Sequence, residues 1–97
     1  MPAYCLVDVD VFDPAGYENY RSQVLPTITR YGGRFLVRGG KFEVREGEWD
    51  LHRVVLLEFP SMEQAKVWYD SPEYQAILGL RTSASRANFV FLEGVPA

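Results

Sequence analysis

The sequence predicts a single α+β domain over residues 1–97, with four strands and two helical regions in the order βαββαβ. Three observations predict it. Residues 4–12 alternate between the two faces of an extended chain, which is the period of a strand. Residues 13–31 then space apolar side chains three and four apart, as an amphipathic helix does. A second change from strand to helix occurs over residues 53–74, where an apolar run ends at a proline.

The first strand and helix are bounded by clear signals. In Tyr4–Phe12 (YCLVDVDVF), Cys5 and the valines share one face, and the two aspartates lie on the other. Asp13-Pro14 supplies an acidic N-cap followed by proline at the first helical position. Gly32-Gly33 ends the helix. Pro26 is expected to kink it, because proline lacks a backbone donor. The apolar stripe consists of Tyr17, Tyr20, Val24, Ile28 and Tyr31.

The middle of the chain predicts two strands joined as a ribbon. Arg34–Arg38 is the second strand, and Gly39-Gly40 is expected to form a bulge. Lys41–Arg45 then continues the strand, and Glu46–Glu48 is the turn. Trp49–Phe59 returns as the third strand.

The last third of the chain predicts a helix, a shorter helix and a strand. Ser61 caps the first of these helices, and Gln64 completes a capping box. Ser71-Pro72 begins the second helix, and Asn88–Glu93 is the final strand. This order is that of a ferredoxin-like fold with a four-stranded antiparallel sheet.

Large apolar side chains lie on both faces of most predicted strands, as with Leu6 beside Val7 and Leu56 beside Leu57. Helices can cover only one face of such a sheet, so a monomer would expose more apolar surface than soluble monomers tolerate. A second copy packed against the open face would cover it, and two-fold symmetry is the commonest arrangement. The sequence therefore predicts a homodimer.

Two stretches carry a resemblance to a known family. RVVLLEFPSMEQAKVWYDSPEY (residues 53–74) and GGRFLVRGG (residues 32–40) resemble the family catalogued as domain of unknown function 1330. The resemblance extends over nearly the whole chain. It implies a dimeric α+β barrel built from ferredoxin-like subunits. It also implies a ligand site between the second helical region and the sheet, where relatives in the wider barrel group bind ligands.

Composition excludes several classes of protein. The net charge of −3 argues against a nucleic-acid partner, which normally requires a basic face. The single Cys5 can form neither an intrachain disulfide nor a zinc cluster, and it lies in an apolar run that predicts a packed thiol. Residues 1–3 show no signal-peptide pattern, and no apolar run approaches the roughly 18 residues that span a membrane. We expect a cytoplasmic protein with no membrane partner.

Charged residues at the strands and the last helix are the first candidates for a ligand pocket. They are Asp8, Asp10, Arg38, Arg53, Glu58 and Arg81. A buried charge is costly unless it is paired. One interpretation pairs an aspartate of the first strand with Arg38, and Glu58 with Arg53 or Arg81. The other assigns them to ligand binding or acid–base chemistry, since a carboxylate desolvated in a cavity has a raised pKa.

The aromatic side chains Trp68, Tyr69 and Tyr74 form a second candidate cluster. At helical spacing they can pack against the sheet as core. Alternatively they form a wall for an apolar or planar ligand, with the tyrosine hydroxyls as hydrogen-bonding groups. Both interpretations stay open.

Several cofactor and metal sites are not predicted. His52 is the only histidine and is expected at the surface, so no helix offers the histidine that haem-handling barrel proteins use. No histidine–carboxylate spacing is typical of a metal site. Gly39-Gly40-Lys41 departs from a phosphate loop, because Phe35 and Phe42 stand where that pattern needs Gly and Ser or Thr.

Two functions agree with the sequence and with what the resemblance implies. The first is a cofactor-independent enzyme, of the monooxygenase or isomerase type found in the barrel group, acting on a small organic metabolite between sheet and helices. The second is a non-catalytic small-ligand-binding or stress-related accessory dimer. The first rests on likeness of fold, which is a weak guide to chemistry.

Overall fold

The predicted order of strands and helices is confirmed by the computed structural model, which describes residues 1–96. Its elements are β1 (Ala3–Val11), α1 (Pro14–Arg30), β2 (Arg34–Arg38), β3 (Arg53–Phe59), α2 (Met62–Asp70), α3 (Pro72–Thr82) and β4 (Ser85–Glu93). The sheet order is β2-β3-β1-β4, and all three strand pairs are antiparallel. This is the ferredoxin-like arrangement that the sequence predicts.

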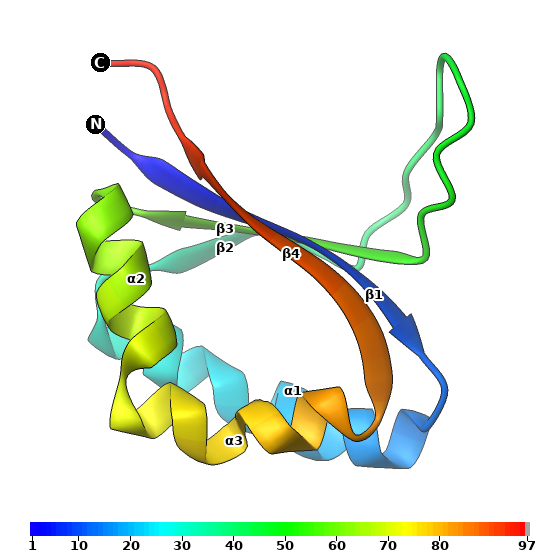
Figure 1. Cartoon of the computed structure of the whole chain (residues 1–97), viewed down its shortest axis with the longest axis horizontal. Helices are drawn as coiled ribbons and strands as arrows, with labels where there is room; N and C mark the ends of the chain where they lie inside the picture. The colour runs from blue at the N-terminus through cyan, green and yellow to red at the C-terminus, as the bar shows by residue number, and fades with distance from the viewer. Residues whose placement is uncertain (97) are drawn as a thin grey trace.

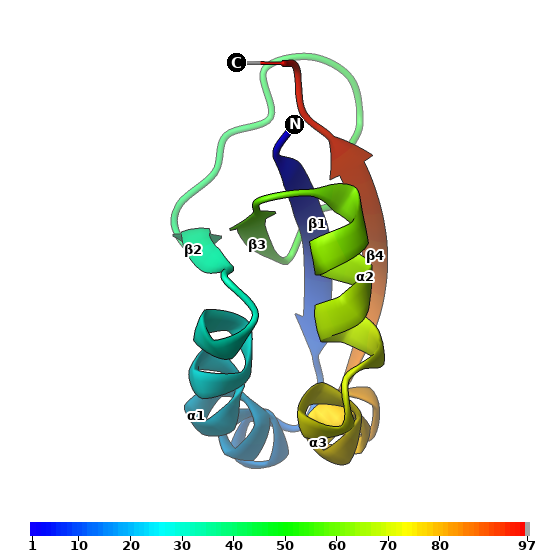
Figure 2. The ribbon, with the colours of Figure 1, turned by 90° about the vertical axis from the view of Figure 1, so that its left-hand side faces the viewer.

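All three helices cover one face of the sheet, which we call the inner face (Figure 1). Helices α1 and α3 lie side by side at the bottom of both views (Figures 1 and 2). Because successive strand residues point to opposite faces, β1 sends Cys5, Val7 and Val9 into the core beneath the helices. The opposite, outer face carries no helix (Figure 1).

The helix ends form as their capping residues predict. Asp13 Oδ1 accepts a hydrogen bond from the Gly16 backbone N–H at 3.2 Å. Ser61 Oγ accepts from the Gln64 N–H at 3.1 Å. The Gln64 side chain, however, donates to the Tyr31 carbonyl at 2.9 Å and so ties α2 to the end of α1. The Ser61–Gln64 capping box is therefore only half formed.

Helix α1 continues through Pro26 to Arg30 and buries the face that the sequence predicts. Tyr20, Val24 and Ile28 pack in the core, and Tyr31 packs against it at the helix end. Tyr20, Val24 and Ile28 also line the pocket described below.

The predicted ribbon of residues 41–52 is wrong. β2 ends at Arg38, β3 begins only at Arg53, and residues 39–52 form an irregular arm that extends past the sheet (Figure 1). Gly39 adopts φ +68°, a left-handed conformation that ends the strand, and the predicted bulge lies earlier, between Phe35 and Val37. Residues 41–52 add no paired residues to the sheet, and an isolated pair of strands is marginally stable.

Candidate functional site

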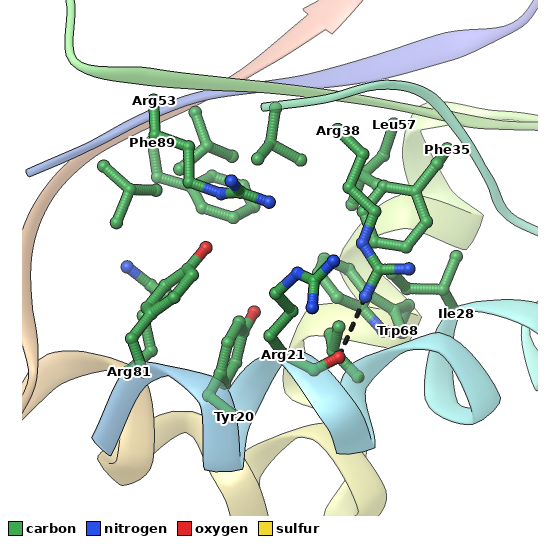
Figure 3. A pocket seen from close by; sticks show the side chains of 15 residues that line it. Tyr20, Arg21, Ile28, Phe35, Arg38, Arg53, Leu57, Trp68, Arg81 and Phe89 are labelled. Atoms are coloured by element: carbon green, nitrogen blue, oxygen red, sulfur yellow. Dashed lines mark hydrogen bonds between the residues drawn. The ribbon is translucent and has the colours of Figure 1, made fainter. Parts of the chain in front are cut away.

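A pocket lies between the inner face of the sheet and helices α1 and α3 (Figure 3). Most of its wall is apolar and is formed by side chains such as Val7, Val9, Ile28, Phe35, Val55 and Leu57. The free space within this partly open pocket measures about 30 Å³, room for roughly two water molecules. The pocket is thus nearly filled by its own side chains.

Four guanidinium groups converge on this pocket from four different elements. Arg21 comes from α1, Arg38 from β2, Arg53 from β3 and Arg81 from α3. Figure 3 shows Arg38 and Arg53 descending from the sheet and Arg21 rising from α1. The fifteen lining residues include no carboxylate, imidazole or thiol. The pocket is therefore cationic, although the chain carries a net charge of −3.

The two arginines at the edge of the pocket have partners. Arg21 Nη1 lies 3.2 Å from a carboxylate oxygen of Glu18, one turn earlier on α1. Arg38 Nη2 donates to the Arg21 backbone carbonyl at 2.9 Å and so links β2 to α1 (Figure 3). The Arg38 guanidinium also lies 4.3 Å from the centre of the Phe35 ring.

Arg53 reaches the pocket beneath the left-handed glycine that ends β2. A Cβ at Gly39 would collide with its guanidinium, so the glycine leaves room for this side chain. The guanidinium lies 5.7 Å from the centre of the Tyr17 ring. Its Nε is buried and has no hydrogen-bond partner. Among residues 1–96, no carboxylate lies within ion-pair distance of Arg53.

Arg81, like Arg53, lacks a paired carboxylate, and its side chain is more deeply buried than that of Arg53. It lies in the last turn of α3 and is only 6% exposed. Its guanidinium lies 5.9 Å from the centre of the Tyr20 ring and 5.7 Å from that of Phe89. Its Nε also lacks a hydrogen-bond partner, and no ion pair involves it in the described part of the chain.

A pair of tyrosines adds neutral hydroxyl groups beside these arginines. The hydroxyl oxygens of Tyr20 and Tyr74 are 2.9 Å apart, so one hydroxyl donates to the other. Burial raises the pKa of both phenols, and the positive charge of Arg81 opposes this rise without cancelling it. Both groups are neutral at pH 7, and the proton of one hydroxyl stays free for another acceptor.

The aromatic cluster is mainly core and touches the pocket through Trp68. Trp68 is 1% exposed, and its Nε1–H donates to the Thr27 hydroxyl at 3.1 Å. Tyr69 packs edge-on against Trp68 and Phe89 and does not line the pocket. Tyr74 lies behind Tyr20, to which it is hydrogen-bonded.

The three acidic candidates do not belong to this pocket. Asp8 accepts hydrogen bonds from the His52 backbone N–H at 2.7 Å and lies 3.0 Å from His52 Nδ1. Asp10 lies 3.7 Å from His52 Nε2. Glu58 pairs with Arg34 at 2.7 Å. The strand alternation that sends Val7, Val9 and Leu57 inward turns these acids to the outer face, so the predicted pairs with Arg38, Arg53 and Arg81 are wrong.

The structure unites Arg38, Arg53, Arg81 and Trp68 from the predicted set. Regular alternation along β2 would place Arg38 on the same face as Leu36, but the bulge between Phe35 and Val37 turns it inward. Sequence reasoning missed Tyr17, Tyr20 and Arg21 as pocket residues. Their helical spacing carried the signal, because the two tyrosines fall on the buried stripe of α1.

The remaining reactive groups offer little chemistry. Burial raises the pKa of the Cys5 thiol to about 12. Within residues 1–96, no three histidine, cysteine or acidic side chains are arranged to hold a metal ion. None of the helices in this range has the length and apolar character that crossing a membrane requires.

Residues 2–95 match the family described as domain of unknown function 1330. The chain belongs to this family. The match confirms the resemblance drawn from residues 32–40 and 53–74. No curated protein matches the chain.

Solved structures with the same fold include three that bear on this family member. RPA0582 from Rhodopseudomonas palustris, a protein of unknown function, is 21% identical with a TM-score of 0.75, over 99% of this chain and 84% of that chain. SnoaB from Streptomyces nogalater, a cofactor-independent oxygenase, is 13% identical with a TM-score of 0.70, over 99% and 95%. A dimeric ferredoxin-like protein of unknown function from Jannaschia sp. CCS1 is 14% identical with a TM-score of 0.70, over 97% and 100%. At these identities the likeness confirms the fold alone.

Proposed function

We propose that this protein is a homodimeric, cofactor-independent enzyme that oxygenates or isomerises a small organic metabolite in the pocket between the sheet and helices α1 and α3. One observation carries the proposal: the side chains of Arg53 and Arg81 line an apolar pocket, and the Nε donor of each is buried without a hydrogen-bond partner. Buried donors without partners are uncommon in folded proteins. Where they converge in a pocket with neutral hydroxyls, they are candidates for contacts with a ligand.

The pocket suits reactions in which the substrate acquires negative charge. Guanidinium groups that are already in place stabilise such charge without the reorganisation that water requires. Isomerisation next to a carbonyl passes through an enolate, and oxygenation without a cofactor needs an electron-rich substrate. The fold shared with SnoaB, a cofactor-independent oxygenase, supports this class by analogy of fold.

A non-catalytic ligand-binding protein is the second candidate. It is favoured by the lack of a carboxylate, imidazole or thiol among the fifteen lining residues. The raised pKa of Tyr20 also means that its neutral hydroxyl is a poor proton acceptor at pH 7. An enzyme would need the proton acceptor to come from solvent or from the substrate itself, whereas a binding protein needs none.

The homodimer is supported by the outer face of the sheet. That face and the arm of residues 39–52 expose apolar side chains: Leu36, Phe42, Val44, Trp49, Val90 and Leu92. A second copy packed on this face would remove them from water. The Jannaschia protein of the same fold is described as dimeric.

Native mass spectrometry of freshly purified protein tests the proposal. We expect a dimer that carries one discrete extra mass per subunit, and the denatured run should release that molecule for identification. Incubating the molecule with the protein then separates the two candidates, since an enzyme changes its mass or isomeric form and a binding protein returns it unchanged. A monomer at micromolar concentration with intact secondary structure would refute the dimer.

A further inference from the structure

The charges around the pocket do not balance. Four guanidinium groups line it, and one carboxylate, that of Glu18, lies against Arg21 at the edge. The Glu18 side chain is 60% exposed and reaches neither Arg53 nor Arg81 in the described structure. Guanidinium groups stay protonated at any physiological pH. The pocket therefore holds an excess of positive charge that nothing in residues 1–96 neutralises.

This excess is costly for the folded protein. Taking a charge out of water is unfavourable unless an opposite charge or good hydrogen bonds replace the water. Arg81 is only 6% exposed, and neutral groups alone lie close to its charge: the faces of Tyr20 and Phe89 and the hydroxyl of Tyr74. Aromatic faces compensate a buried cation only in part. An anion supplied from outside the chain would restore the balance.

The free donor atoms indicate which anion fits. Carboxylates bind guanidinium groups through two parallel hydrogen bonds, and Nε with one Nη forms one such pair of donors. Nε is the atom that lacks a partner in both Arg53 and Arg81. The free tyrosine hydroxyl proton of the Tyr20–Tyr74 pair offers a further donor beside Arg81.

The apolar side chains of the pocket indicate the chemical character of the rest of the ligand, which we call its body. Val7, Val9, Leu57, Phe89 and the ring of Trp68 supply an apolar wall that suits a flat, unsaturated or aromatic group. A cavity of about 30 Å³ does not hold such a molecule. Entry therefore requires side chains to move, and the Arg38–Arg21 hydrogen bond at the edge is the contact that would open (Figure 3).

We infer that the ligand is a small aromatic or unsaturated monocarboxylate. Its carboxylate lies between Arg53 and Arg81, its apolar body lies against Trp68 and Phe89, and Arg38 releases the Arg21 carbonyl to admit it. The inference rests on the proposed function and narrows it to one chemical class of ligand.

Matched acids and amides test the inference on the protein of residues 1–97. The probes are benzoate and cinnamate, their neutral amides, and inorganic phosphate, titrated calorimetrically. The variants are Arg53→Met and Arg81→Met, which keep an unbranched stem without the charge. Arg30→Met is the control, because Arg30 is an exposed arginine of α1 that does not line the pocket. Circular dichroism establishes that each variant folds, and Arg53→Lys and Arg81→Lys replace any that does not.

We expect wild type and Arg30→Met to bind an acid of the panel at least ten times more tightly than its amide, since hydrogen bonds to charged groups differ from neutral ones by about this factor. Each Met variant should raise the Kd of the acid about 10- to 100-fold and leave that of the amide unchanged. Lys variants should fall between, because they keep the charge without the two-pronged donor.

Three results would overturn the inference. Equal affinity for acid and amide would show a pocket that binds small molecules without regard to charge, and the proposed function would survive. Phosphate binding as tightly as the acids would show that the apolar body contributes nothing. If no acid binds, the inference is wrong, and the native mass measurement still judges the proposed function separately.

Discussion

The two faces of the sheet differ in how their charged side chains are satisfied. On the outer face Asp8 contacts His52 and Glu58 pairs with Arg34, so each buried or half-buried acid has a partner nearby. Beneath the inner face, Arg53 of β3 and Arg81 of α3 have no acidic partner in the described structure. Charges that a fold needs are normally paired within it. The unpaired inner arginines therefore indicate a ligand-binding site more strongly than the paired charges of the outer face do.

Substitution of two neighbouring leucines of β3 compares the two faces directly. We expect it to produce the largest change in stability. Leu57 is 3% exposed in the inner core, and Leu57→Ala should lower the free energy of unfolding by about 2–5 kcal/mol. Leu56 points to the outer face, so Leu56→Ala should mainly weaken the proposed dimer. Urea unfolding at several protein concentrations measures both. Equal, concentration-independent losses for the two variants would contradict the assignment of the outer face to a dimer.

Removing an unpaired inner charge should stabilise the protein without ligand. Arg81→Met keeps an apolar stem and deletes a buried cation that has no anion, so we expect a gain of about 0.5–2 kcal/mol. The matched outer-face change, Arg34→Met, breaks an exposed ion pair and should cost about 1 kcal/mol or less. Thermal unfolding measures both. A marked fall in Tm for Arg81→Met would mean that the fold itself uses this charge.

The tyrosine pair should contribute a smaller amount. Tyr20→Phe removes the hydrogen bond between the Tyr20 and Tyr74 hydroxyls and should cost about 1 kcal/mol. Tyr17→Phe is the control, because the Tyr17 hydroxyl makes no hydrogen bond within residues 1–96. Both are measured by urea unfolding. An equal cost for the two substitutions would argue against the hydrogen bond.

The smallest effect concerns the outer-face pair of Asp8 and His52. Burial alone would raise the pKa of Asp8, but hydrogen bonds from His52 outweigh it and lower that pKa. The hydrogen bond with Asp8 raises the pKa of His52, and the charges of Asp10 and Asp50 add to this rise. The stabilisation that Asp8 contributes, because its pKa is lowered by folding, is lost as pH falls below about 4. The stabilisation that His52 contributes, because its pKa is raised by folding, is lost as pH rises above about 6.5.

His52→Gln should therefore lower Tm most between about pH 4 and pH 6.5, with a smaller difference on either side. Tm measured against pH for wild type and variant checks this. A difference that is the same at every pH would show that the pair contributes through packing rather than charge.

Local signals in the sequence predicted most of the fold. Asp13, Ser61 and Ser71 cap the helices as expected, because each cap depends on a few neighbouring residues. The alternation of β1 correctly separated Cys5 and the valines from the two aspartates, although it did not say which of the two faces is the inner one. The arm of residues 39–52 was predicted wrongly, since its alternating pattern is local while a strand also needs a neighbour to pair with.

The site was less predictable for a related reason. Whether Arg38 points inward depends on the position of one bulge, and a shift of one residue reverses the face of every side chain that follows. The acids were predicted as partners of the arginines from charge alone. In the structure Asp8 pairs with His52 and Glu58 pairs with Arg34, both on the outer face. Pairing between strands depends on register, which single residues do not reveal.

The most direct test observes the Nε atoms of Arg53 and Arg81, because the inferred carboxylate site depends on them. The Nε–H resonances of Arg53 and Arg81 can be observed by nitrogen-15 NMR while benzoate or benzamide is added, with Arg30 as the internal control. We predict that benzoate shifts both pocket resonances and slows their exchange with water, whereas benzamide leaves them in place and Arg30 does not respond. Unchanged Arg53 and Arg81 resonances at benzoate concentrations that saturate binding would contradict the account.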